Sequence, residues 1–417
     1  MRFLFYSHDG VGFGHVRRHL AIATALVECF PGAKVLIATS LDEVSQLGLP
    51  RNIDTLKLPA LRKVANNEYG SRRLGLPSED IYALRSALLQ AAVKAFRPAA
   101  VLVDKHPFGA GGEFWAALGT ARALGARAVL GLRDILDGRA AVRKEWADGQ
   151  VLECIAEYYD LVLVYGARSV FDPIAEYEFP PTLAERTKYC GYVVNGPGRA
   201  RVGAMVPAFQ QLELDFHPCV LATTGGGEDG FRVLETFVRA SEDAPWKGIA
   251  VAGPMLNQRE FNILEALAGR SGVALHRFIP CLPDLFCRLD GLVCMGGYNT
   301  LVEAASQALP TICIPRSSPR SEQLLRARVF EQLGLLRCIC SEQLTVEKLR
   351  HEVNAALETN RGKKMNRSSS VLDFQGARRA ASHLLEVVGV GRRRKVSRLE
   401  RVAWSGDRLG RPAGKQR

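Results

Sequence analysis

The chain has 417 residues, of which 47% are hydrophobic and 24% charged, a composition typical of a folded protein with two or three domains. This composition excludes a disordered chain, a fibrous protein and a small disulfide scaffold. No apolar run approaches the roughly 18 residues of a membrane span, and the N-terminus lacks a signal-peptide pattern, so we expect a cytoplasmic protein.

The net charge of +12 is concentrated at the C-terminal end. Residues 391–417 carry ten Lys and Arg residues against Glu400 and Asp407, which leaves only four net positive charges for the rest of the chain. Such a tail can make peripheral contact with an anionic membrane, or it can be disordered and solvated. Trp404 is its only aromatic residue, so the tail offers few stacking platforms and we expect no nucleic-acid partner.

The ten cysteines include no C-x-x-C pair, and several lie in apolar strand-like runs such as Leu292-Val293-Cys294. For a chain without an export signal, this pattern indicates reduced and buried thiols. We therefore expect neither a disulfide framework nor a metal site.

Short aliphatic runs alternate with helix-period segments along the first half of the chain, the pattern of βαβ units. Near-continuous apolar strands predict parallel sheets that are covered on both faces. The predicted strands of the first half are 3–7, 34–38, 99–104, 127–132 and 161–164.

The pattern breaks between about 180 and 217, where Pro180-Pro181 and Asn195-Gly196-Pro197-Gly198 indicate a linker. It then resumes with strands at 219–223, 248–252, 273–278, 291–294 and 311–314. The predicted fold class is α/β, with two Rossmann-like, doubly wound parallel-sheet domains that face a cleft. The predicted divisions are an N-terminal domain at 1–195, a linker at 196–217, a C-terminal domain at 218–390 whose last helix can pack back on the first domain, and a tail at 391–417.

The first predicted strand ends in a glycine-rich loop, His8-Asp9-Gly10-Val11-Gly12-Phe13-Gly14-His15, before a helix. The G-x-G-x-G spacing does not match the G-x-G-x-x-G dinucleotide fingerprint. His15 begins the helix and can act as a general base near neutral pH, but a histidine that caps the helix or is merely exposed would fit the same pattern.

The second domain repeats the arrangement at 223–230, where Gly225, Gly226 and Gly227 follow an apolar strand and precede a helix. Backbone amides in such a loop can approach a diphosphate closely, and the helix N-terminus favours its negative charge. A tight structural turn is the alternative. The segment lacks the G-K-[ST] sequence of Walker-type nucleotide triphosphatases.

The segment 277–316 holds the largest number of candidate binding residues. Gly296 and Gly297 end a strand, and Asn299 and Thr300 begin a helix whose first turn is expected to hold Glu303. That carboxylate can accept hydrogen bonds from both hydroxyls of a ribose, or it can simply cap the helix. Further polar candidates at the next strand-to-helix connection are Arg316, Glu322 and Gln323.

These residues resemble the donor-binding half of the GT-B glycosyltransferases, and family 28 in particular. The resemblance covers roughly 216–335 and depends on Gly296-Gly297-Tyr298-Asn299-Thr300, Glu303-Ala304, the run at 310–315 and Glu322-Gln323. In the N-terminal half it depends mainly on Gly14-His15. The glycine-rich loop there departs from the pattern of the family, which leaves the acceptor open.

The resemblance implies a nucleotide-sugar donor, in most cases UDP-linked, and no other cofactor. It implies that Ile279 lies behind the base, that Glu303 binds the ribose and that Gly225, Gly226 and Gly227 contact the diphosphate. By the same resemblance Glu322 and Gln323 bind the sugar, Gly12 and Gly14 belong to the acceptor-side loop, and His15 is the base.

The expected function is that of an inverting, metal-independent hexosyltransferase. The expectation of metal independence comes from the lack of a D-x-D motif, which would hold a metal ion. Asp104, at the end of its strand, is a second candidate base, and Arg316 or Lys105 can stabilise the departing diphosphate. Two alternatives are a nucleotide-sugar epimerase with the same fold and a non-catalytic regulator that binds nucleotide sugars.

Overall fold

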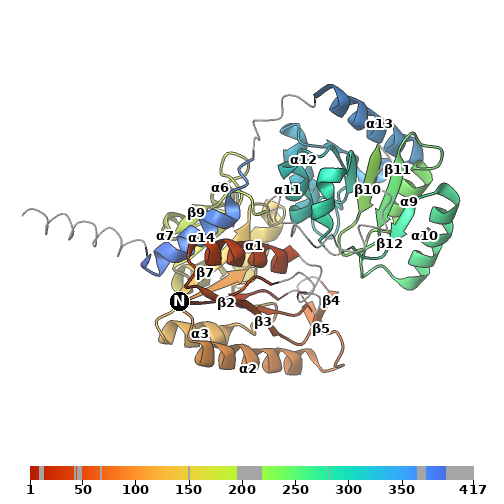
Figure 1. Ribbon diagram of the computed structural model, residues 1–417. Coiled ribbons are helices and arrows are strands. Elements are labelled where there is room, and N and C mark those ends of the chain that lie inside the picture. Colours follow the sequence, from red (N-terminus) through yellow and green to blue (C-terminus); the bar gives the residue numbers. More distant parts are fainter. Residues whose placement is uncertain are drawn as a thin grey trace, which may run out of the picture.

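The computed structural model describes residues 1–8, 14–41, 44, 49–65, 68–148, 151–194, 218–279, 281–363 and 372–390. The predicted linker at 196–217, the basic tail at 391–417 and Gly12 of the first loop lie outside these residues. Figure 1 shows two α/β lobes, one formed by the first half of the chain and the other by most of the second half.

A seven-stranded parallel sheet forms the first lobe, in the order β3-β2-β1-β6-β7-β8-β9. Apolar side chains cover both faces of its central strands, which explains why their sequences are apolar at nearly every position. Its strands are β1 (Arg2–Tyr6), β2 (Lys34–Thr39), β3 (Ile53–Lys57), β6 (Ala100–Asp104), β7 (Arg127–Arg133), β8 (Leu161–Tyr165) and β9 (Thr187–Tyr189).

The helices of the first lobe lie on both faces of this sheet. The helices α1 and α14 cover one face, while α2 and α3 cover the other (Figure 1). A small antiparallel hairpin, β4 (Leu61–Ala65) with β5 (Glu68–Ser71), packs against α2. The helices are α1 (Gly14–Cys29), α2 (Ser78–Phe96), α3 (Trp115–Ala123), α4 (Arg139–Asp148), α5 (Val151–Tyr158), α6 (Pro173–Glu176) and α7 (Pro181–Glu185).

The second lobe is a six-stranded parallel sheet in the order β12-β11-β10-β13-β14-β15. One face packs on α9, α10 and α13, and the other face packs on α11 and α12. Its strands are β10 (Cys219–Thr223), β11 (Lys247–Val251), β12 (Ala274–His276), β13 (Gly291–Cys294), β14 (Thr311–Cys313) and β15 (Arg337–Cys338). Its helices are α9 (Phe231–Ala240), α10 (Gln258–Ser271), the 3-10 helices η2 (Leu282–Arg288) and η3 (Ser341–Gln343), α11 (Tyr298–Ser306), α12 (Glu322–Gln332) and α13 (Val346–Lys363).

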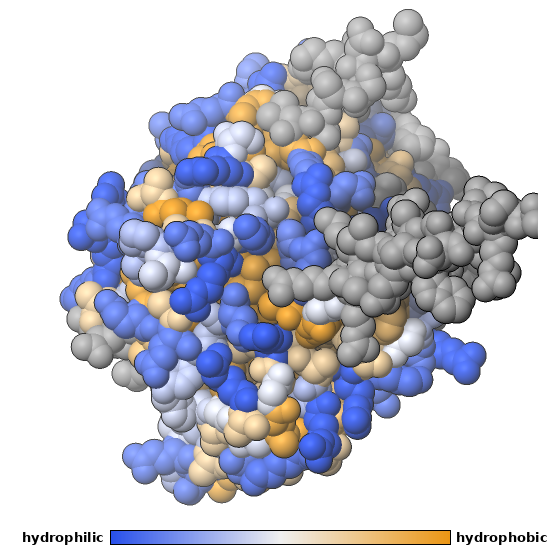
Figure 2. Space-filling view, turned by 90° about the vertical axis from the view of Figure 1, so that its left-hand side faces the viewer, coloured by the Kyte–Doolittle hydropathy of each residue, from blue (hydrophilic) through white to orange (hydrophobic). Residues whose placement is uncertain are grey.

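The last described helix, α14 (Gly376–Val387), returns to the first lobe and packs against α1 (Figure 1). Its buried residues Ala380, Ala381 and Leu384 join the apolar cluster of that face. Seen from the side of this lobe, the surface is largely hydrophilic with small, separate apolar areas, as expected for a face exposed to water (Figure 2).

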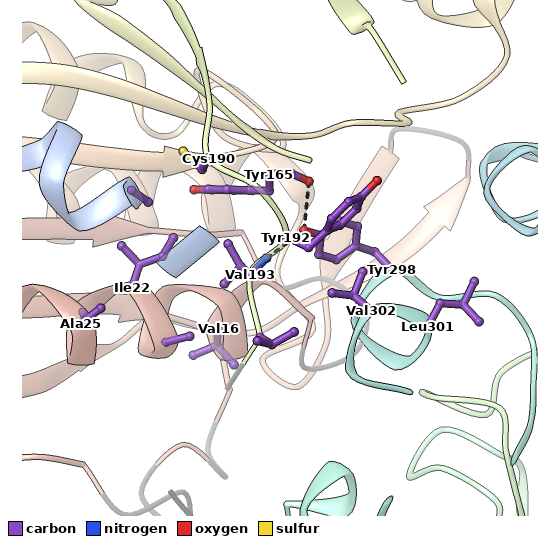
Figure 3. Close-up of a cluster of buried hydrophobic side chains, with 14 of the residues drawn as sticks. Val16, Ile22, Ala25, Tyr165, Cys190, Tyr192, Val193, Tyr298, Leu301 and Val302 are labelled. Atoms are coloured by element: carbon purple, nitrogen blue, oxygen red, sulfur yellow. Dashed lines mark hydrogen bonds between the residues drawn. The ribbon is translucent and has the colours of Figure 1, made fainter. Parts of the chain in front are cut away.

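A buried aromatic group joins the two lobes. The hydroxyl of Tyr298, on α11, donates to the carbonyl oxygen of Tyr165 at 2.9 Å and accepts from the amide of Val193 at 3.3 Å (Figure 3). Apolar residues of α1 and α14 belong to the same buried cluster as Leu301 and Val302 of α11. The lobes therefore share a continuous core beside the cleft.

The predicted α/β architecture with two parallel sheets is confirmed, and the predicted strands agree with observed ones to within a few residues. The strands β3, β4, β5, β9 and β15 were not predicted. These are edge or hairpin strands with polar residues, so they lack the apolar runs that mark the central strands.

We predict that Gly376→Ala destabilises the junction between α14 and the first lobe. A Cβ atom at Gly376 would lie 2.5 Å from the carbonyl group of Tyr192, so the backbone has to shift, at a typical cost of about 1–3 kcal/mol. Thermal unfolding followed by circular dichroism measures the effect.

The control is Gly119→Ala in α3, where nothing lies within 4 Å of the new Cβ. We expect this variant to gain up to about 1 kcal/mol because alanine favours the helix. Equal melting temperatures for Gly376→Ala and the wild type would contradict the predicted clash.

Candidate functional site

The site lies where the strand order reverses in each sheet. In the first sheet β1 lies between β2 and β6, and in the second β10 lies between β11 and β13, so the loops after the central strands diverge. Ligands of doubly wound sheets bind at this point, outside the carboxyl ends of the strands. Loops from both lobes line a cavity of about 360 Å³, which is large enough for a small organic ligand.

The cavity brings together most of the predicted site residues. From the first lobe it is lined by Gly14 and His15, and from the second by Gly225, Gly226, Gly227, Ile279, Gly297, Asn299, Thr300, Arg316, Glu322 and Gln323. Asp104, Gly296 and Glu303 are buried and do not belong to the cavity lining.

His15 and Asp104 form a pair at the carboxyl ends of β1 and β6. His15, the second residue of α1, places its Nδ1 atom 3.2 Å from Oδ1 of Asp104. With the proton on Nδ1, the imidazole donates to the carboxylate and leaves Nε2 as the proton acceptor. The pair is therefore suited to general-base catalysis.

Arg18 completes this group, although sequence analysis did not select it. Its Nε and terminal nitrogen donate to both carboxylate oxygens of Asp104 at 2.7–2.9 Å, and its guanidinium lies 5.3 Å from the ring centroids of Tyr165 and Tyr298. The spacing of three residues from His15 puts both side chains on one face of α1, a signal that could have found it.

The pairing bears on the choice between the two candidate bases, His15 and Asp104. Burial alone would raise the pKa of Asp104, but the Arg18 guanidinium and then His15 hold that pKa well below its usual range. A carboxylate that binds protons so weakly is a poor base. Of the two candidate bases, this arrangement favours His15, with Asp104 placed to orient its imidazole.

Glycine is structurally required in the first loop of the second lobe. Gly225 and Gly227 have φ angles of +69° and +92°, and a Cβ on Gly227 would lie 2.3 Å from the carbonyl oxygen of Ala252. The loop leads from β10 into α9. Its backbone lines the cavity, where the adjacent helix N-terminus favours an anion.

The second glycine corner joins β13 to α11. Gly296 has a φ of +84°, and its carbonyl oxygen accepts from the buried Arg326 at 3.2 Å. Gly297 caps α11, which begins at Tyr298, so Glu303 lies in the second turn and not, as predicted, in the first. Glu303 is 6% exposed. Its carboxylate interacts electrostatically with the guanidinium of Arg17 in the first lobe.

The polar residues predicted to bind the sugar already have protein partners. Glu322 lies 2.6 Å from Arg133 of the first lobe, and this charge, with that of Arg326, outweighs burial and lowers the pKa of Glu322 to about 2. The side chain of Gln323 accepts from the backbone amide of Arg316 at 3.1 Å. Arg316 in turn pairs with Asp229.

Two further groups lie on the first-lobe side of the cavity: Lys105, which the sequence analysis selected as a cation for the departing diphosphate, and His8, which it did not select. Burial and the nearby Arg133 lower the pKa of Lys105 to about 8, and Lys105 lines the cavity. The ring centroid of His8 is 5.0 Å from that of His15 and 4.5 Å from that of His106. Burial, followed by the charges of His106 and His15, lowers the pKa of His8 well below its usual range, which favours a neutral ring.

The described residues contain neither a candidate metal cluster nor a candidate membrane-spanning helix. Within them, no group of three or more His, Cys, Asp or Glu side chains could hold a metal ion. No helix in the described part of the chain has the length and apolar character needed to cross a bilayer.

Known glycosyltransferases are similar to this chain in sequence and in fold. The glycosyltransferase family 28 C-terminal domain matches residues 226–384. A relative from Cutibacterium acnes, named UDP-N-acetylglucosamine--N-acetylmuramyl-(pentapeptide) pyrophosphoryl-undecaprenol N-acetylglucosamine transferase, is 25% identical over 182 residues, which cover 41% of this chain and 49% of the relative. The chain thus matches about half the length of this curated relative.

Solved structures match over most of the chain. The apo UGT2 of Phytolacca americana covers 93% of this chain and 94% of its own, with a TM-score of 0.59 and 14% identity. MurG of Acinetobacter baumannii covers 93% and 98%, with a TM-score of 0.51 and 15% identity. The fold is therefore GT-B. Residues 226–384 match the C-terminal domain of glycosyltransferase family 28, which confirms the predicted resemblance of the second lobe to the donor-binding half of that family.

We predict that Arg18→Met destabilises the protein by roughly 3–5 kcal/mol at neutral pH, because it leaves the buried carboxylate of Asp104 without its cation. Without Arg18, burial raises the pKa of Asp104 above its value in the unfolded chain. The folded state then binds the additional proton, so the deficit relative to the wild type shrinks as the pH falls toward 4.

Urea unfolding between pH 4 and pH 8 measures this difference. The control is Arg139→Met, which removes the partner of Glu178, an exposed carboxylate that water solvates in the absence of the arginine. A deficit that stays constant with pH would show that Arg18 does not hold Asp104 in its ionised form.

Proposed function

We propose that the protein transfers a hexosyl group from a UDP-sugar to an acceptor hydroxyl, with inversion at the anomeric carbon and without a metal. The observation that carries the proposal is one cavity lined by His15, which is paired to a buried carboxylate, and by the glycine loop 225–227 of the other lobe. The name of the curated relative, which includes UDP-N-acetylglucosamine, supports a UDP-linked donor.

In the proposed reaction, the acceptor oxygen attacks the anomeric carbon from the face opposite the diphosphate. The new carbon–oxygen bond forms as the bond to the β-phosphate oxygen breaks, and UDP leaves with the electron pair. Nε2 of His15 accepts the proton of the acceptor hydroxyl. Asp104 stabilises the resulting imidazolium through Nδ1.

Negative charge that develops on the departing UDP would be stabilised by the protein. The backbone of loop 225–227 and the N-terminus of α11 supply oriented amides, and Lys105 supplies a cation on the opposite side of the cavity. Arg316 lines the same cavity, with its charge shared by Asp229. We propose that these groups do the work that a metal ion does in other transferases.

We further propose that the protein is cytoplasmic and makes peripheral contact with an anionic membrane through residues 391–417. Binding of liposomes with and without anionic lipid, by the full chain and by a chain ending at 390, tests the membrane contact.

A thermal-shift screen of nucleotides and UDP-sugars, followed by an assay of UDP release, tests the function. A bound ligand raises the melting temperature with the logarithm of its concentration over Kd. Acceptor-dependent release of UDP supports a transferase. Epimerised sugar without an acceptor would identify an epimerase, and binding without turnover would identify a regulator.

We predict that His15→Ala lowers turnover by roughly 10²- to 10⁴-fold, the usual effect of removing a general base. The dissociation constant for UDP should change less than about twofold, because the predicted donor contacts belong to the other lobe. Steady-state kinetics and calorimetry measure the two quantities. Full turnover of His15→Ala would reject its role as the base.

We predict that Glu303→Ala weakens UDP binding by roughly tenfold or more, because a carboxylate that binds two ribose hydroxyls contributes at least about 1.5 kcal/mol. Uracil and ribose-free diphosphate serve as control ligands, whose binding should not change. An unaltered dissociation constant for UDP would remove Glu303 from the ribose site.

A further inference from the structure

The side chain of Asn299 connects the donor lobe to the helix that carries the base. Asn299 is the second residue of α11, in the second lobe. Its Nδ2 donates to the carbonyl oxygen of Gly14 at 2.9 Å, and its Oδ1 accepts from a terminal nitrogen of Arg18 at 3.3 Å. Both partners belong to α1 of the first lobe, so one amide spans the cleft.

Only one orientation of this amide satisfies both contacts. A carbonyl oxygen can only accept and a guanidinium can only donate, so the nitrogen of Asn299 faces Gly14 and its oxygen faces Arg18. A Cβ at Gly14 would lie 3.1 Å from Nδ2 of Asn299, which is tighter than ordinary contact. Glycine at this position thus permits the close approach of α11.

Both contacts of Asn299 are with neighbours of His15. Gly14 is the residue before it, so the hydrogen bond to its carbonyl oxygen holds the peptide group that joins the two residues. Arg18 lies 3.2 Å from Nδ1 of His15 and binds both oxygens of Asp104, the partner of His15. Asn299 therefore restrains the base from its backbone side and from its carboxylate side.

We infer that Asn299 is a positioning residue: its contact between the second lobe and α1 fixes the orientation of His15. The inference rests on the proposed function, in which His15 is the base. Both ends of the amide contact α1, and Asn299, a predicted donor-binding residue, also lies at the N-terminus of α11, where its backbone can contribute to a diphosphate site.

Asn299→Asp tests the inference, because it keeps the shape of the side chain but cannot donate to the carbonyl oxygen of Gly14. We expect turnover at saturating donor to fall roughly tenfold, which corresponds to about 1.4 kcal/mol for a lost hydrogen bond. The neutral variant Asn299→Ala adds no charge beside the proposed diphosphate site, so its Kd for UDP should change less than about twofold. A parallel rise in that Kd would mean that the side chain contacts the donor.

The matched control is Gln307→Glu at the end of the same helix. The amide of Gln307 donates to the carbonyl oxygen of Pro283 at 3.1 Å, within the second lobe. It thus makes the same kind of contact without crossing the cleft. Equal losses of turnover in both variants would indicate a general effect on α11 and would overturn the inference.

A double-mutant cycle shows whether Asn299 acts through His15. In the His15→Ala background, Asn299→Asp should cost less than about twofold in turnover, because the group that it positions is absent. If the two losses multiply, Asn299 acts independently of His15 and the inference is wrong. Full turnover of His15→Ala alone would instead be a failure of the proposed function.

Hydrogen exchange supplies a readout that needs no acceptor. Asn299→Asp should speed amide exchange in the first turn of α1, around Gly14 and His15, several-fold relative to the wild type and to Gln307→Glu. Unchanged exchange there would overturn the coupling even if the proposed reaction is correct.

Discussion

The buried pair of Arg18 and Asp104 is the interaction on which the arrangement of the cleft depends. Both side chains are almost completely removed from water, at 2% and 0% exposure, and such a pair is stable only when its geometry satisfies both charges. The planar guanidinium binds both carboxylate oxygens and still has a nitrogen for Asn299. A lysine could not make this set of contacts, so one arginine holds together the base, its carboxylate and the other lobe.

The same structural solution occurs twice, once in each lobe. In each sheet the strand order reverses beside the central strand, and the loop after that strand leads into a helix at the cleft. In the first lobe this position holds an imidazole, and in the second it holds glycines with positive φ angles. This difference between two similar lobes is the basis for the proposal that the first lobe supplies the base and the second lobe binds the donor.

The sequence predicted the central strands and the glycine corners well, because buried parallel strands are apolar throughout and glycine runs mark the turns after them. It did not predict β3 or the β4–β5 hairpin, whose strands are short and partly polar. Arg18 was missed because its partner Asp104 is 86 residues away, a contact that only the folded sheet creates. For the same reason the contact between the Asn299 side chain and α1 was not predicted.

The central claim is that both lobes contribute to one donor and acceptor pocket, and a crystal structure of the complex with UDP tests it most directly. We expect the diphosphate within hydrogen-bonding distance of the backbone amides of Gly225–Gly227 and of the first turn of α11. The ribose should contact Glu303, with His15 facing the open side of the same cavity. UDP bound elsewhere on the molecule, or with its phosphates directed away from both glycine corners, would contradict the proposed site.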